Sequence, residues 1–321
     1  MQRVSAAVIF SRWFSTAVIA VSLACATSAL AAQAYVIVDS KSGFVLQERE
    51  SKQKRQVGSL TKIATAAVVL DWAEKHQGDL GQKATMPPEA FVGVSENLVG
   101  FQPGDVVELR DLLYAALVQS DNAAAYTLAD HVGRAIAPIV PRAGDGSPVA
   151  IFVGQMNALA KTLGMTRTLF VNPHGSDANV KPVPYSTASD MARLARYAMN
   201  KAGFRFYVSQ KERQISWSRG GKTQSYILRN TNELLGQEGV EGVKTGRTAR
   251  AGDCLILSAQ KQAEIVKHGE NSATIFPRHL IIVLLGSTNR FEEGRQMLSL
   301  GWQLYDQWAA NGRVVDPKKT L

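Results

Sequence analysis

Strand-like segments cluster at the two ends of this chain and helical segments fill its middle, and this order restricts the fold more than any other feature. Apolar and β-branched runs typical of strands occupy residues 34–38, 43–47, 225–228, 242–246, 254–258 and 279–285. Segments typical of helices occupy residues 59–77, 109–119, 123–133, 151–163, 186–199 and 297–309. Such segregation predicts an α+β fold with one antiparallel sheet built from both chain ends, flanking helices and an inserted helical lobe. We expect the sheet part at about 33–60 and 205–312 and the lobe at about 61–204, with a catalytic groove between them.

The first 31 residues are typical of an export signal. Arg3 and Arg12 accompany a mainly apolar stretch, and Ala29-Leu30-Ala31 supplies an Ala-x-Ala cleavage signal, so we expect cleavage after Ala31. The rival interpretation is an uncleaved membrane anchor, because the apolar stretch is nearly long enough to span a bilayer. The sequence therefore predicts export to the periplasm or another extracytoplasmic cell-wall space, with a single domain over residues 32–321.

The charge balance restricts the partners. The chain carries 36 Lys and Arg against 27 Asp and Glu, a formal net charge of +9. Loss of Arg3 and Arg12 with the leader leaves roughly +7, which suits peripheral contact with a membrane or with an anionic wall polymer. No basic run with interleaved aromatic residues supports nucleic acid as a partner. The five histidines lack the spacing of a metal site, so we expect neither a metal nor another cofactor.

The first candidate for chemistry is Ser59-Leu60-Thr61-Lys62, at the start of a predicted helix. Residues three apart share a helix face, so the Lys62 ammonium can reach the Ser59 hydroxyl, and a serine beside an amine is a recurring activated nucleophile. Taken alone, the quartet favours a helix-capping serine and a surface lysine. A second quartet from Ser51 to Lys54 lies in a polar run with no apolar helix behind it, and we interpret it as a solvated turn.

Two further motifs lie downstream of Ser59. Ser120-Asp121-Asn122 stands at the junction of two predicted helices, where its side chains can point into a cleft. Taken alone, the motif favours a helix stop at Ser120 and an N-cap at Asn122. Lys244-Thr245-Gly246 lies in a strand-like stretch rich in glycine. Glycine in a strand permits close approach of a ligand or of another backbone, which favours a functional interpretation of this triplet.

These three motifs, in this order, resemble those of penicillin-binding proteins and serine β-lactamases. Additional stretches are similar to the low-molecular-mass D-alanyl-D-alanine carboxypeptidase and endopeptidase family: 162–165, 172–175, 186–192 and 240–246. The resemblance covers residues 33–310, nearly the whole predicted mature chain. It implies a fold like that of β-lactamases and DD-peptidases. The longer carboxypeptidases add a C-terminal β-domain, which we do not expect here because few residues follow Ala309.

The resemblance implies a role for each motif residue. Ser59 would attack a D-Ala carbonyl with Lys62 as base, Ser120 would pass a proton to the leaving amine, and Asn122 would hold the substrate amide and Lys62. The backbone N–H groups of Ser59 and Arg247 would form the oxyanion hole. The substrate carboxylate would be bound by Lys244, Thr245, Gly246 and Arg247. Arg247 and Arg290 are both candidate cations for that carboxylate, although a solvated surface position is favoured for each.

The resemblance leaves four activities in competition. A carboxypeptidase acting on peptidoglycan stem peptides, with β-lactams as covalent inhibitors, is preferred. An endopeptidase of cross-links is the first alternative, followed by a serine β-lactamase and by a wall-binding or β-lactam-sensing module that does not turn over. The β-lactamase is disfavoured because residues 172–179 contain no Glu to activate a deacylating water, and His174 in that loop is expected to shape the loop rather than to catalyse.

Overall fold

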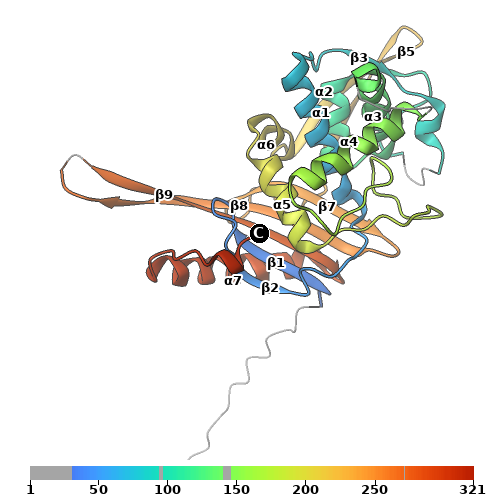
Figure 1. Cartoon of the computed structure of the whole chain (residues 1–321). Helices are drawn as coiled ribbons and strands as arrows, with labels where there is room; N and C mark the ends of the chain where they lie inside the picture. Colours follow the sequence, from blue (N-terminus) through green and yellow to red (C-terminus); the bar gives the residue numbers. More distant parts are fainter. Residues whose placement is uncertain (1–30, 94–96, 140–145, 271) are drawn as a thin grey trace, which may run out of the picture. The chain divides into compact units, whose positions relative to one another are not determined.

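The computed structural model describes residues 31–93, 97–139, 146–270 and 272–321, and Ala31–Leu321 forms one compact unit (Figure 1). Apart from Ala31, the predicted export signal lies outside the described residues. Within the described part, no helix combines the length and the apolar character needed to cross a bilayer.

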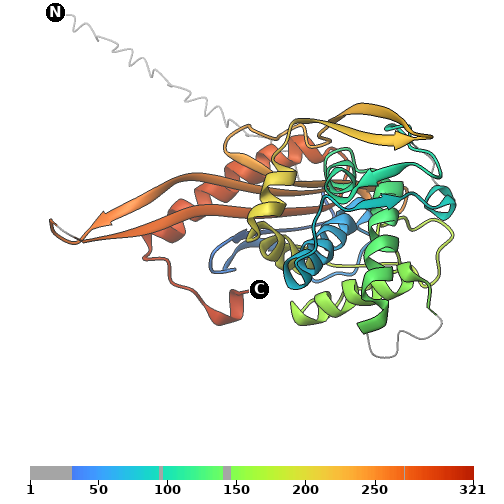
Figure 2. The same ribbon diagram turned by 90° about the horizontal axis from the view of Figure 1, so that it is seen from above.

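Five antiparallel strands from the two ends of the chain form the main sheet, as the order of the sequence segments predicts. They are β1 (Ala34–Asp39), β2 (Val45–Arg49), β7 (Val240–Thr248), β8 (Gly252–Lys267) and β9 (Ala273–Ser287). Their order in space is β2-β1-β9-β8-β7, so β7 is an outer strand with one edge not paired to another strand. The β8 and β9 strands continue beyond the sheet as a long two-stranded arm (Figure 2). The α+β expectation is confirmed.

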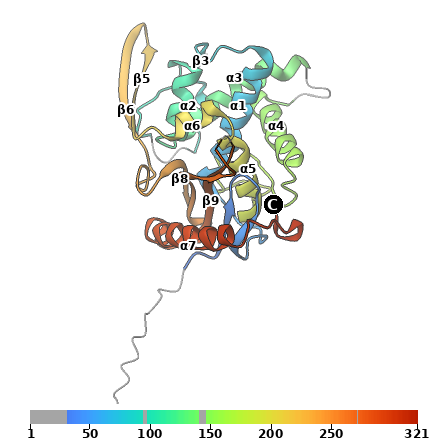
Figure 3. The ribbon, with the colours of Figure 1, turned by 90° about the vertical axis from the view of Figure 1, so that its left-hand side faces the viewer.

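Alternating residues of the central strands face two helical layers, as the two-residue period of a strand requires. One face packs on α7 (Arg290–Ala310) and the other on α5 (Ala188–Met199) (Figure 3). Two glycines let α7 come close: a Cβ on Gly301 would lie 3.1 Å from Ile37 Cγ2, and one on Gly294 would lie 2.9 Å from Leu255 Cδ2. Each buried aliphatic side chain of such a layer stabilises the fold by about 1.5–3 kcal/mol.

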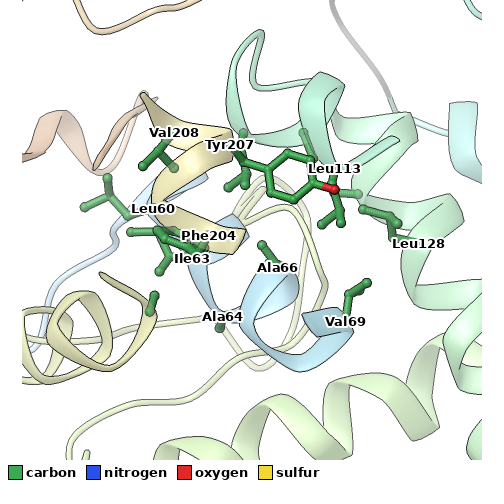
Figure 4. Close-up of a cluster of buried hydrophobic side chains, with 14 of the residues drawn as sticks. Leu60, Ile63, Ala64, Ala66, Val69, Leu113, Leu128, Phe204, Tyr207 and Val208 are labelled. Carbon is green, nitrogen blue, oxygen red and sulfur yellow. The ribbon is translucent and has the colours of Figure 1, made fainter. Parts of the chain in front are cut away.

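The helical part packs around one central helix. Lys62–His76 forms α1, which is surrounded by the neighbouring helices α2 (Leu109–Leu117), α3 (Asn122–Ile136), α4 (Pro148–Thr162) and α6 (Ala202–Val208). The first eight residues of α1 are all buried, because small and apolar residues occupy every side of its first two turns. Its Ile63, Ala66 and Val69 contact this shell (Figure 4). A short 3₁₀ turn, η1 (Gly58–Thr61), precedes α1 and places Ser59 at the helix entry.

A second antiparallel sheet lies beside the helices and was not foreseen in the sequence. Its strands are β3 (Lys83–Thr85), β4 (Val106–Glu108), β5 (Glu212–Arg219) and β6 (Lys222–Arg229), in that spatial order. The expected sheet part at about 205–312 begins within a helix instead, α6 (Ala202–Val208). Three further 3₁₀ turns complete the described elements: η2 (Pro88–Phe91), η3 (Ala137–Ile139) and η4 (Pro317–Lys319).

Candidate active site

Ser59 lies where η1 packs against the free edge of β7. Gly58 has a φ of +53°, and a Cβ at that position would lie 3.2 Å from the backbone nitrogen of Arg247. A Cβ on Gly246 would lie 2.7 Å from the carbonyl oxygen of Val57. Glycine at both positions therefore allows η1 and β7 to approach closely and brings the serine and the Lys244-Thr245-Gly246 strand together.

Lys62 is fully buried and its amine is held by three acceptors. Nζ donates to Ser59 Oγ at 2.9 Å, to Asn122 Oδ1 at 2.7 Å and to the carbonyl oxygen of His174 at 3.1 Å. Burial lowers the pKa of Lys62 from 10.5 to about 7, against the opposing effect of the Asp121 carboxylate. When the ammonium loses its proton, the nitrogen lone pair becomes available to accept the Ser59 hydroxyl proton. The predicted serine–lysine pair thus has the contact and the lowered amine pKa that an activated nucleophile requires.

The Ser120-Asp121-Asn122 turn joins α2 to α3. Ser120 adopts a φ of +67°, a left-handed conformation that reverses the chain between the helices. The Asp121 side chain caps α3 by accepting the backbone N–H of Ala124 at 2.8 Å, so the first residue of that helix, Asn122, is fixed against Lys62. The N-cap of α3 is therefore Asp121 rather than Asn122. Burial raises the pKa of the Asp121 carboxyl.

Lys244 brings a second buried amine to β7. Its side chain is 1% exposed, and Nζ donates to the carbonyl oxygen of Thr245 at 3.1 Å. The pKa of Lys244 is lowered well below its usual value by burial, by the charge of Lys62 and by that of Arg290. The Thr245 hydroxyl shares a hydrogen bond of 2.7 Å with the Thr231 hydroxyl. The amine of Lys244 and the hydroxyl of Thr245 thus come from adjacent residues of one strand.

A cavity of about 380 Å³ joins these parts. Its lining combines residues of the three motifs with their neighbours: Ser59, Leu98, Gln119, Ser120, Asp121, Asn122, Thr231, Thr245, Gly246, Arg247 and Arg290. Another cavity, of about 460 Å³, lies between α1, α3, α4 and α5 and contains none of the predicted site residues. The chemistry predicted in the sequence therefore lies in the cavity at the η1–β7 junction.

The two arginines beside this cavity differ. The Arg247 side chain is 76% exposed, in agreement with the expected surface position. The same expectation is wrong for Arg290, whose side chain is 18% exposed. Its Nη1 donates to the carbonyl oxygen of Gly246 at 2.9 Å and to Asp253 Oδ1 at 3.3 Å, so a nearby carboxylate and a strand carbonyl hold it inside. Arg290 thereby supports the strand that carries Lys244.

The loop at 172–175 supplies a group that the sequence analysis did not assign, the His174 carbonyl that accepts from Lys62. The Asn172 side chain accepts the backbone N–H of Gly175 at 2.7 Å, and His174 Nδ1 accepts that of Ser176 at 3.2 Å. Burial and the charge of Lys62 lower the pKa of His174 to about 3, so its ring is neutral near pH 7. These bonds agree with the expected loop-shaping role. Every residue has a backbone carbonyl, so the sequence does not single out that of His174 as an acceptor for Lys62. The Asn-Pro-His-Gly stretch indicated only that a turn lies there.

This chain is similar to known proteins over most of its length. The sequence profile of the D-alanyl-D-alanine carboxypeptidase family matches residues 21–267. The chain belongs to this family. A D-alanyl-D-alanine carboxypeptidase, DacD of Salmonella typhimurium, is 34% identical over 88% of this chain and 66% of its own length. A D-alanyl-D-alanine endopeptidase of Pseudomonas aeruginosa is 30% identical over 71% of this chain and 67% of its own length.

Solved structures agree with the family assignment. The Streptomyces K15 DD-transpeptidase has a TM-score of 0.70 and 27% identity, covering 85% of this chain and 98% of that protein. Penicillin-binding protein D2 of Listeria monocytogenes, in its ampicillin-bound form, has a TM-score of 0.65 and 25% identity, covering 86% and 99%. The likeness confirms the predicted DD-peptidase fold. The chain spans 62–66% of the length of the curated carboxypeptidases DacC of Escherichia coli and DacD of Salmonella.

Proposed function

We propose that this chain is an exported serine DD-peptidase that cleaves D-alanyl amide bonds of peptidoglycan stem peptides through an acyl-enzyme on Ser59. The observation that carries the proposal is the contact of 2.9 Å between Ser59 Oγ and a fully buried Lys62 amine. Because the pKa of Lys62 is about 7, a large fraction of the molecules hold this amine in its neutral form near pH 7, as a general base requires. Removal of a terminal D-Ala, the carboxypeptidase reaction, is the preferred activity.

In the proposed acylation step, Lys62 takes the hydroxyl proton of Ser59 while Oγ attacks the carbonyl carbon. The oxyanion is held by the backbone N–H groups of Ser59 and Arg247, a type of interaction worth about 3–4 kcal/mol per donor. The close approach of Gly58 to the Arg247 nitrogen supports this pairing, because it places the two backbone segments side by side. Ser120, at the cavity wall, passes the proton to the leaving amine.

In the proposed substrate complex, the terminal carboxylate lies along β7. Lys244, Thr245, Gly246 and Arg247 of this strand bind it in the proposal: Thr245 offers its hydroxyl, Gly246 and Arg247 line the cavity, and the buried Lys244 amine lies beside Thr245. Asn122 Nδ2 is available to the substrate amide because Oδ1 of the same side chain holds Lys62. The family relationship supports β-lactams as covalent inhibitors, since a structural relative is a penicillin-binding protein in an ampicillin-bound form.

The endopeptidase reaction is the second candidate. It uses the same acylation chemistry on a cross-linked D-Ala amide, and the 30% identity to the Pseudomonas endopeptidase supports it as an alternative. The two reactions differ in whether a free carboxylate or a longer chain follows the cleaved bond.

The test compares two substrates with one pair of serine variants. The mature chain is incubated with a pentapeptide ending in D-Ala-D-Ala and, separately, with cross-linked muropeptides, and the products are measured by liquid chromatography. We expect release of D-Ala from the pentapeptide, loss of that release in Ser59→Ala, and retention of it in Ser51→Ala, the serine of the other quartet. Cutting of muropeptides without D-Ala release would establish the endopeptidase instead, and no cutting of either substrate would overturn the proposal.

A further inference from the structure

Glu293, in the first turn of α7, carries a buried carboxylate. The α7 helix packs on the face of the main sheet opposite to α5. The Glu293 side chain is 6% exposed, its Oε1 accepts the Ser287 hydroxyl at 2.7 Å, and its Oε2 accepts the backbone N–H of Ala32 at 2.6 Å. Among the ion pairs of the described residues, none includes Glu293. The Glu293 carboxylate is thus nearly excluded from water and accepts hydrogen bonds from two neutral groups.

A carboxylate in such a place calls for a cation. Glutamate is almost never fully buried without a charged partner, because two neutral donors do not replace the hydration of a full negative charge. Oε2 accepts its hydrogen bond from the nitrogen of Ala32, the residue directly after the Ala29-Leu30-Ala31 signal. A free amino group on that nitrogen would supply the missing charge without any movement of the chain.

We propose that Glu293 is the binding site for the amino terminus of the mature chain, created when the bond between Ala31 and Ala32 is cut. A processing peptidase hydrolyses that bond with one water molecule, leaving a carboxylate on Ala31 and an amine on Ala32. The amine takes up a proton at neutral pH, since α-amino groups titrate near pH 8. The ammonium then pairs with Glu293 Oε2 at the position of the present N–H.

The surroundings of Ala32 hold the terminus in place. Ala32 itself is fully buried, and Arg49 donates to its carbonyl oxygen. The next residue, Gln33, donates its backbone N–H to the carbonyl oxygen of Leu285 at 3.0 Å. The chain that directly follows the new amine is therefore fixed, and an additional residue before Ala32 would displace the charge from the carboxylate.

The pair also organises the corner that leads to the active site. Ser287 donates its hydroxyl to Glu293 and accepts the backbone N–H of Asn289 at 3.0 Å, and Asn289 caps α7 through Glu292. Arg290, the next residue, supports the carbonyl of Gly246. Processing thereby places a charge pair one helical turn from the arginine that supports the substrate strand.

The test is a two-by-two comparison of thermal stability in the purified chain. One form begins with the amine of Ala32 and the other carries one additional glycine before it, each with Glu293 or with Glu293→Gln. We expect the authentic form to melt about 5–10 °C higher than the extended form when Glu293 is present, and the difference to vanish in Glu293→Gln. Glu292→Gln, an exposed change in the same helical turn, is the matched control and should leave the difference intact.

A second measurement does not depend on folding of the variant. The exported protein should begin at Ala32 by intact mass, and its α-amine should resist an amine-acetylating reagent in the native state and react on unfolding. A start at another residue, an amine that reacts at the unfolded rate, or an equal melting difference in both Glu293 backgrounds would overturn the assignment. None of these readouts depends on peptidase activity, so failure here is distinguishable from failure of the proposed function.

Discussion

The rate of acylation should follow the protonation of Lys62, and the structure sets where that titration lies. Burial lowers the pKa of this amine from 10.5 to about 7. At pH 7 about half of the molecules then hold the neutral base, whereas an unperturbed lysine would be neutral in roughly one molecule in 3,000. The second-order rate constant for acylation by a penicillin should therefore rise between pH 5 and pH 8 and reach half its maximum near pH 7.

Asp121→Asn tests the physical origin of that midpoint. The Asp121 carboxylate raises the pKa of Lys62, so its removal should lower that pKa and shift the acidic limb of the profile to lower pH, by roughly 0.5–1. Asparagine can still cap α3 by accepting the N–H of Ala124, which keeps Asn122 in place. Asp130→Asn, a change in the same helix at a carboxylate paired with Arg134, should leave the midpoint unchanged.

The assay is the pre-steady-state acylation rate with a fluorescent penicillin across pH 5–9, for the wild type and both variants. A rate that still rises at pH 9 without a plateau would show that burial does not lower the pKa of the base to about 7. A midpoint near 7 that does not move in Asp121→Asn would show that the coupling between this carboxylate and Lys62 is absent.

Three further predictions concern stability and support of the site. Gly175→Ala should abolish acylation and destabilise the fold by several kcal/mol, because the new Cβ would lie 1.9 Å from the carbonyl oxygen of Gly58 at a φ of +86°. Gly154→Ala faces open space, so denaturant unfolding should show a neutral or stabilising effect. Arg290→Leu should slow acylation about 10–100-fold, because it removes the hydrogen bond to the Gly246 carbonyl. Arg295→Leu, an exposed change in the same helix, should leave the acylation rate unchanged, and a penicillin-binding assay measures both rates. The pKa of Lys62 is lower in the folded chain than in the unfolded chain, so wild-type stability relative to Lys62→Met should rise by about 4 kcal/mol from pH 7 to pH 10.5. A flat difference in denaturant titrations would contradict the burial argument.

The contact between Ser59 and Lys62, the proposed catalytic pair, was predictable because helical spacing is local information. Ser59 and Lys62 share one turn, so their contact follows from sequence distance once a helix is predicted. Asn122 joined them through the order of the motifs, and the structure places its Oδ1 at 2.7 Å from the amine. The motifs in the sequence select Lys62 and Lys244 as functional candidates. The sequence does not predict that both amines are buried, because burial depends on packing from distant segments.

The parts that were missed depend on contacts between distant segments. The α6 helix contains Phe204, Phe206, Tyr207 and Val208, residues that favour strands, and its packing against α1 overrides that preference (Figure 4). The second sheet pairs β4 with β5, which lie more than a hundred residues apart, so no local pattern announces it. Arg290 was expected at the surface from its charge, and the Asp253 carboxylate and the Gly246 carbonyl hold it inside.

The most direct test of the account is intact and peptide mass spectrometry of the mature chain after exposure to a penicillin. The account predicts one covalent adduct of the mass of the ring-opened drug, located on the peptide that contains Ser59, absent in Ser59→Ala and present in Ser51→Ala. An adduct on another residue, or none at all with the wild-type chain, would contradict the assignment of Ser59 and Lys62 as the nucleophile and its base.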